Sequence, residues 1–181
     1  VCEQLAAARE GDIYRDPAGR WTIRPYRPGD EARILDRFRR GFGVDRSIEH
    51  WRWKFKANPV GHCYMRLAET PAGEVVGQYV GLPARAIYGE RTRIFTQIID
   101  VAVDPRFRRG LKRPGLFGTL ADAYITEYLV SGQVPIGYGF PTAEALRIGQ
   151  RVAGYVPLQP VVRMVLDLGG NRNGRPPWSA R

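Results

Sequence analysis

Basic side chains and glycines gather in one short segment near the middle of the chain, a combination that suits an anion. An apolar run ends just before this segment and a helical pattern begins just after it, so we expect the segment to join a strand to the first turn of a helix. Unpaired backbone amides and the helix dipole favour an anion at such a junction. The segment therefore predicts a phosphate-binding loop, with a solvated basic surface as the alternative. Its bases are Arg106, Arg108, Arg109, Lys112 and Arg113, and Gly110 and Gly115 lie among them.

Other residue types that could do chemistry are few. His50 and His62 are the only histidines, and Cys2 and Cys63 are the only cysteines. Neither pair has metal-ligand spacing, so no metal site is predicted. Two cysteines are also too few for a disulfide framework, which is typical of a reducing compartment. Cys63 would need an adjacent base to act as a nucleophile, and His62 is only its neighbour in sequence.

The charge balance restricts the kind of partner. The 181 residues carry a formal net charge of +10, with 44% hydrophobic and 25% charged residues, a composition typical of one soluble globular domain. Such a charge favours anionic partners, which include nucleic acid, membrane surfaces and phosphorylated cofactors. Because no run of about 18 apolar residues is present and the first residues include acids where a signal peptide has bases, we expect a cytoplasmic location and no membrane partner.

Hydrophobic periodicity predicts the elements that position the basic segment. Helices are expected after Asp30, which would act as a cap, from Leu116 over about 14 residues, and after Thr142, a second cap. The segment from His50 to His62 fits either a strand or a helix. Expected strands cover residues 21–25, 64–69, 74–82, 84–88, 93–103, 134–140 and 161–168.

This order of elements predicts an α+β fold with a mixed, largely antiparallel central sheet flanked by helices. Residues 1–20 are expected to form an N-terminal extension and residues 21–168 a single domain. Residues 169–181 have the composition of a flexible C-terminal tail.

Five motifs in a fixed order resemble the GNAT N-acetyltransferase superfamily. In that family a strand with a V-x-P-like end leads to an Arg/Gln-x-x-Gly-x-Gly/Ala loop and a helix that bind the pyrophosphate of acetyl-CoA. A later helix that ends in Gly-Phe or Gly-Tyr closes the site. The resemblance covers residues 21–168, and the sequence is similar to a bacterial branch of this superfamily. It is carried by VAVDP (101–105), RFRRG (106–110), GLFGTL (115–120), IGYGFP (136–141) and RIGQRVAGY (147–155).

The resemblance implies transfer of an acetyl group, or another acyl group, from acyl-CoA to a primary amine of a small molecule by direct attack on the thioester. Strand backbone would polarise the thioester carbonyl, and amides of the basic segment would hold the pyrophosphate. An insertion relative to the family, Leu111 to Pro114, would reshape this loop without removing its amides. The implied cofactor-binding residues are Val101, Ala102, Val103, Arg108, Arg109, Gly110, Lys112, Arg113, Gly115, Leu116, Phe117 and Thr142.

Asp100 is the candidate general base, because the resemblance places it beside the thioester. Strand alternation puts it on one face with Thr96, Ile98 and Ala102, so apolar groups would flank the carboxylate. Partial burial makes a carboxylate a better proton acceptor near neutral pH. The alternative is a strand aspartate paired with one of the many arginines.

The general acid is less defined. The family often places a tyrosine in its last helix to protonate the departing thiolate, but Gly149 or Gln150 falls near that position here. The possible substitutes are Tyr124, Tyr138 and Tyr155, of which Tyr138 is named as the candidate without a ranking among them.

The acceptor side is predicted only in outline. Trp51, Trp53 and Phe55 are expected either to wall an acceptor pocket or to belong to the core. A longer acyl chain, an acyl group on a carrier protein and a homodimer all stay open.

A different class of function also stays open, namely a non-catalytic module that binds CoA or nucleic acid through its basic face. Nucleic acid is disfavoured because the bases cluster at one loop and no aromatic-basic recognition motif is present.

Overall fold

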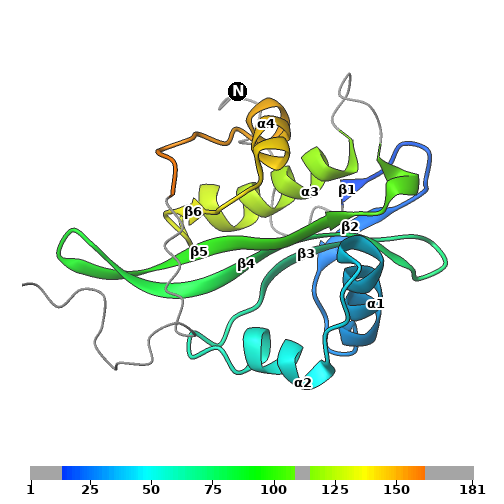
Figure 1. The fold of residues 1–181 in the computed structure, drawn as a ribbon, viewed down its shortest axis with the longest axis horizontal. Helices are drawn as coiled ribbons and strands as arrows, with labels where there is room; N and C mark the ends of the chain where they lie inside the picture. The colour runs from blue at the N-terminus through cyan, green and yellow to red at the C-terminus, as the bar shows by residue number, and fades with distance from the viewer. Residues whose placement is uncertain (1–13, 109–114, 162–181) are drawn as a thin grey trace, which may run out of the picture.

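A single mixed sheet runs through the computed structural model, which describes residues 14–108 and 115–161 (Figure 1). Its six strands follow chain order, the first five pair antiparallel, and the sixth pairs parallel to the fifth. This confirms the predicted α+β class with a largely antiparallel sheet. The strands are β1 (Tyr14–Arg15), β2 (Thr22–Pro25), β3 (Tyr64–Glu69), β4 (Val75–Tyr88), β5 (Arg91–Val103) and β6 (Gly137–Tyr138).

Helices cover both faces of the sheet. In Figure 1, α1 (Glu31–Phe42) and α2 (Ile48–Trp51) lie on one side, and α3 (Leu116–Tyr124) and α4 (Ala143–Val152) lie on the other. Two of these helices continue as π-helical turns, α2 through Arg52–Lys56 and α3 through Ile125–Val130. Within residues 14–108 and 115–161, no helix combines the length and the apolar character needed to cross a bilayer.

Two hydrophobic clusters fill the space between these layers. One joins the sheet to α3 and includes Tyr79, Leu120 and Tyr124, and the other joins the sheet to α1 and α2 and includes Ile34 and Trp51. The helical spacing of apolar residues from Leu116 onward, which predicts α3, is therefore the face that α3 buries.

Several local predictions change in the structure. The predicted strands 74–82 and 84–88 are one continuous strand, β4, and the undecided segment 50–62 is largely helical from His50 to Lys56. The sheet also begins earlier than expected, because residues 14 and 15 of the supposed extension pair with β2. The last predicted strand, 161–168, and the tail lie almost entirely outside the described residues.

Asp30 stands at the N-cap position of α1 but does not cap the helix. Its side chain makes no capping hydrogen bond and instead accepts from the Arg27 backbone N–H at 2.8 Å and from Arg24 Nη1 at 2.7 Å. The capping prediction is wrong because Arg24 is a buried cation that needs this carboxylate more than the solvated first turn of α1 does.

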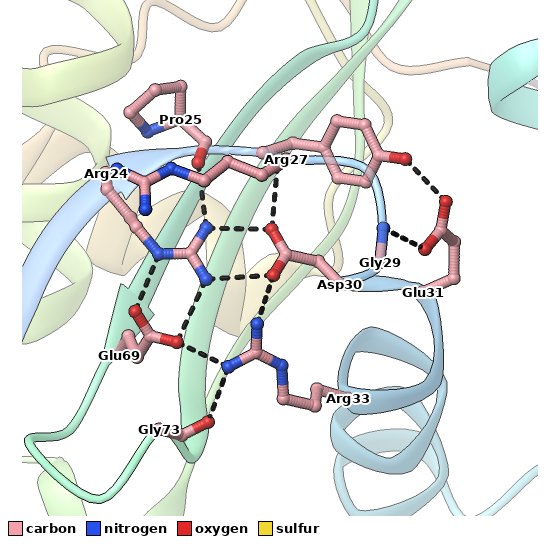
Figure 2. Close-up of polar contacts among 10 residues, drawn as sticks. Arg24, Pro25, Arg27, Gly29, Asp30, Glu31, Arg33, Glu69 and Gly73 are labelled. Atoms are coloured by element: carbon pink, nitrogen blue, oxygen red, sulfur yellow. Dashed lines mark hydrogen bonds and ion pairs between the residues drawn. The ribbon is translucent and has the colours of Figure 1, made fainter.

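Figure 2 shows the network that results. Arg24 on β2 reaches Asp30 with both terminal nitrogens and Glu69 on β3 with Nε at 2.7 Å. Arg33 on α1 bonds to the same two acids and to the carbonyl of Gly73 in the β3–β4 turn. The network thereby joins β2, α1, β3 and the next turn.

Replacing Asp30 by Ala is expected to cost about 3–5 kcal/mol of unfolding free energy, because it leaves Arg24 buried without its main partner. Burial raises the pKa of Asp30 while the bonds from Arg24 and Arg27 lower it, and the balance lies below the usual value. This stabilisation is therefore present above the ordinary aspartate pKa and is lost as the pH falls through the lowered folded-state pKa.

The matched control is Asp36→Ala, because Asp36 lies on the exposed face of the same helix and, among the described residues, forms ion pairs with Arg39 and Arg40 alone. Its loss should stay below about 1 kcal/mol. Equal losses for the two variants in urea denaturation would contradict the role given to Asp30.

Candidate active site

A β-bulge interrupts the pairing of β4 and β5 near the middle of the sheet. Gln78 pairs with Ala102 and Val80 pairs with Ile99, so two residues of β5, Asp100 and Val101, lie opposite the single residue Tyr79. Asp100 has a φ of 52°, in the left-handed region. An extra residue of this kind bends the strand and leaves part of the ladder unpaired.

The bulge overturns the predicted alternation along β5. Ile98 packs against the cluster on the α3 side, whereas Ala102 lies beside Gly41 of α1 on the opposite side. Asp100 also points to the α1 side, where its carboxylate meets Arg46. The expectation that Asp100 shares an apolar face with Thr96 and Ile98 is therefore wrong.

Asp100 is an ion-paired residue in this structure. Its Oδ2 accepts from Arg46 Nη1 at 2.5 Å and from Lys54 Nζ at 3.2 Å, and its Oδ1 lies 3.4 Å from Arg46 Nη2. This is the pairing that the sequence left open as the alternative. Both cations compete with a substrate amine for this carboxylate, and the catalytic role of Asp100 stays a prediction.

Before the bulge, the other edge of β5 pairs with β6 over two positions. Thr96 is opposite Gly137 and Gln97 is opposite Tyr138. From Ile98 to Val103 the β5 edge next to β6 therefore has no ladder partner within the described part of the chain. This edge runs from the bulge toward the start of α3.

Tyr155, which follows α4, reaches back to the centre of the sheet. Its hydroxyl lies 2.7 Å from the hydroxyl of Tyr79, the residue opposite the bulge. Tyr79 is 1% exposed and stacks at 4.9 Å on Tyr124. Within α4, a Cβ added at Gly149 would lie 2.1 Å from the Tyr155 ring. Tyr155 therefore occupies the place of the side chain that Gly149 lacks.

Both hydroxyls of this pair keep their protons at neutral pH. Burial raises the pKa of Tyr155 and the bond from Tyr79 lowers it, with a net value above the usual one. Burial is also the main reason that the pKa of Tyr79 is strongly raised. With Tyr79 donating to Tyr155, the proton of Tyr155 is free for another acceptor.

The predicted phosphate-binding segment is described only at its two ends. Arg106 bonds to Asp104 and Glu74, and Arg108 donates from Nε to the Val103 carbonyl at 3.0 Å. At the other end, α3 begins after Gly115 with no side-chain capping bond. The N-cap residue therefore offers no side-chain acceptor to the first-turn amides of α3, which start at Leu116. Arg109, Gly110, Lys112, Arg113 and the Leu111 to Pro114 insertion lie outside the described residues.

The three aromatic residues that were expected to wall an acceptor pocket or to belong to the core lie in different environments. Trp51 and Phe55 are 1% and 4% exposed and belong to the core between α2 and the sheet, so walling an acceptor pocket is the wrong alternative for these two. Trp53 is 70% exposed and stacks edge-on with His50.

Tyr138 lies away from the tyrosine pair. Gly137 faces α3, since a Cβ there would lie 3.4 Å from Leu129, and alternation then turns Tyr138 to the other face. Thr142 caps α4 by accepting from the Ala145 backbone N–H at 3.2 Å, which is the structural role predicted for it.

Cys63 does not form a nucleophilic pair. Burial raises the pKa of its thiol to about 11, so it is protonated at neutral pH. His62 stacks on Tyr64 at 4.3 Å, and burial lowers its pKa. Among the described residues, no three His, Cys, Asp or Glu side chains come together as a metal site.

The sequence of residues 22–149 matches the acetyltransferase (GNAT) domain, and the chain belongs to this family. Comparison with curated proteins finds no match. The fold is shared with solved structures at low sequence identity. An acetyltransferase of Trypanosoma brucei has a TM-score of 0.63 and 16% identity over 81% of this chain and 99% of that chain.

Two aminoglycoside-modifying enzymes have the same fold. An aminoglycoside N-acetyltransferase in complex with CoA has a TM-score of 0.61 and 13% identity over 83% of this chain and 98% of that chain. An aminoglycoside acetyltransferase from an uncultured soil metagenomic sample, in complex with sisomicin, has a TM-score of 0.63 and 16% identity over 84% and 99% of the two chains.

Gly149→Ala should destabilise the protein by about 1–3 kcal/mol, because the new methyl group must displace the Tyr155 ring. At an open helical site the same change stabilises by up to about 1 kcal/mol, so the sign of the effect is diagnostic. Chemical denaturation measures it, and a stabilised variant would contradict the packing described for Tyr155.

Proposed function

We propose that this protein is an N-acyltransferase that transfers an acetyl group from acetyl-CoA to a primary amine of a small molecule, in the cytoplasm. Membership of the GNAT acetyltransferase family supports the reaction class. The observation that carries the proposal is the Tyr155 hydroxyl, held by Tyr79 beside the bulge and the unpaired edge of β5.

The described residues fit an acyl-CoA cofactor. The uncapped first turn of α3, from Leu116, offers amides for the pyrophosphate, and Arg108 adds positive charge at the same end of β5. The bulged backbone from Asp100 to Val103 would hold the acyl carbonyl. When bound, acyl-CoA supplies an acyl group activated as a thioester.

Tyr155 is the general acid in this proposal, in place of Tyr138. It is protonated at neutral pH, has its hydroxyl proton available when Tyr79 is the donor in the bond that they share, and fills the space of Gly149, near which the family places its tyrosine. Its proton would go to the sulfur that leaves when the amine takes the acyl group. The amine releases its proton to solvent water as the amide forms.

A small-molecule amine suits the acceptor side better than a macromolecule. Two solved structures of the same fold act on aminoglycosides. Those enzymes share only the fold with this chain, and only the class of amine is inferred from them. The side on which an acceptor would meet the bulge is the one that carries Arg46 and Lys54.

Acetyl-CoA should bind with a dissociation constant in the micromolar to low millimolar range, measured by isothermal titration calorimetry at moderate salt. Acceptor screening with a panel of primary amines, followed through release of free thiol, should then give turnover. No heat of binding at millimolar acetyl-CoA, together with steeply salt-dependent binding of DNA, would favour the non-catalytic alternative.

Tyr155→Phe should lower kcat by about 10²-fold, because it removes the proton donor and keeps the ring on Gly149. The dissociation constant for acetyl-CoA should change little. In the wild type, the raised pKa of Tyr155 means that its deprotonation should cause no loss of rate between pH 7 and pH 9. Tyr138→Phe serves as the matched control, and a larger loss from Tyr138→Phe than from Tyr155→Phe would reverse the assignment.

A further inference from the structure

Side chains from three different elements converge on the bulged residue of β5. Gln78 of β4 donates from Nε2 to the Asp100 carbonyl at 2.7 Å. Arg46, between α1 and α2, and Lys54, in the π-helical turn, hold the Asp100 carboxylate at 2.5 and 3.2 Å. The backbone and the side chain of Asp100 are thus fixed separately.

The conformation held in this way is unfavourable by itself. Asp100 is the one residue other than glycine with a positive φ in the described part of the chain. Left-handed backbone costs roughly 1–2 kcal/mol for most residues, although aspartate tolerates it better than most. Such outliers persist only where the surroundings fix them, and they cluster at functional sites.

Burial of the polar Gln78 side chain lowers the stability of the fold. Its side chain is 1% exposed, and its Oε1 has no hydrogen-bond partner within residues 14–108 and 115–161. A buried acceptor without a partner destabilises the fold, and an apolar side chain of the same length would avoid that cost. The polar contact that the Gln78 side chain does make is the bond from Nε2 to the Asp100 carbonyl in the bulge.

We propose that Gln78 and Asp100 are positioning residues for the acyl transfer. The Gln78 amide and the left-handed backbone of Asp100 hold β5 open at the bulge, so that backbone N–H groups left out of the ladder can face the acyl carbonyl. Asp100 thereby acts through its conformation and its anchoring contacts, and its carboxylate is not the proton acceptor. This inference rests on the proposed function.

Two replacements of Asp100 separate conformation from charge. Asp100→Gly removes the carboxylate and keeps the left-handed backbone, whereas Asp100→Val removes both. A misplacement of about 1 Å in a reacting group costs up to about 10²-fold. The glycine variant should therefore retain at least about ten times the kcat of the valine variant. If the carboxylate were the general base, both variants would be equally inactive.

Gln78→Met tests the amide. The kcat should fall by about 10²-fold, as for loss of one preorganised donor, while the dissociation constant for CoA and the thermal midpoint stay near their wild-type values. Infrared difference spectra of acetyl-CoA labelled with ¹³C at the carbonyl should show the bound carbonyl stretch moving toward its value in free solution. A purely structural role for Gln78 would lower the thermal midpoint and leave this frequency unchanged.

The matched control is Asn58→Ala, because Asn58 also donates a side-chain amide to a β4 carbonyl, that of Pro83 at 3.2 Å. It should leave kcat and the carbonyl frequency unchanged. Wild-type protein is measured first, and failure to bind or turn over acetyl-CoA overturns the proposed function. Normal kcat in Gln78→Met, with an active wild type, overturns this inference alone.

Discussion

The extra residue in β5 is the constraint on which the rest of the site depends. Because the side chains of a strand alternate with a period of two, one inserted residue exchanges the faces of everything that follows it. Ile98 therefore packs toward α3, whereas Asp100 and Ala102 turn toward α1. The insertion also leaves Tyr79 opposite the gap in the ladder, where its hydroxyl can hold Tyr155.

The parts of the fold that follow from local periodicity could be predicted from the sequence. The apolar spacing from Leu116 identifies α3, and Thr142 caps α4 as expected. The bulge could not be predicted, because the strand carries no glycine where the chain turns left-handed and Asp100 fits a regular strand equally well. A regular alternation continued through Asp100 therefore predicts the wrong face of the sheet for its side chain. The cap expected at Asp30 failed for a comparable reason, since its partner, the buried Arg24, lies on β2 and is fixed there by a second acid, Glu69 of β3.

Tyr155, the proposed general acid, shows a second limit of sequence reasoning. A glycine near the family's tyrosine position indicates only that a side chain is missing there. Tyr155 lies six residues further on, past the end of α4, and the chain must turn back for its ring to cover Gly149. The backbone bond from Tyr155 N–H to the Gly149 carbonyl, at 3.2 Å, closes that turn. The glycine before it, Gly154, has a φ of 66°, so the pair Gly154-Tyr155 is the signal that was present in the sequence.

The two faces of the sheet differ in how they are held. On the α3 side, aromatic and aliphatic groups pack continuously around Tyr79 and Tyr124. On the α1 side, a second hydrophobic cluster that includes Val80 and Ile99 lies next to buried polar groups. Arg37 is fully buried there and its guanidinium nitrogens have no hydrogen-bond partner among the described residues.

Burial lowers the pKa of Arg37, and the nearby charge of Asp104 only partly offsets this. An arginine nevertheless stays charged in proteins, so this side of the sheet holds a buried cation without a hydrogen-bond partner among the described residues, as well as the unsatisfied Oε1 of Gln78. Unsatisfied buried groups lower the local stability, and selection for stability alone would replace them. Such groups occur on both faces of the sheet, because Tyr124 of α3 and Thr126 of its π-helical turn also carry buried hydroxyls without a hydrogen-bond partner among the described residues.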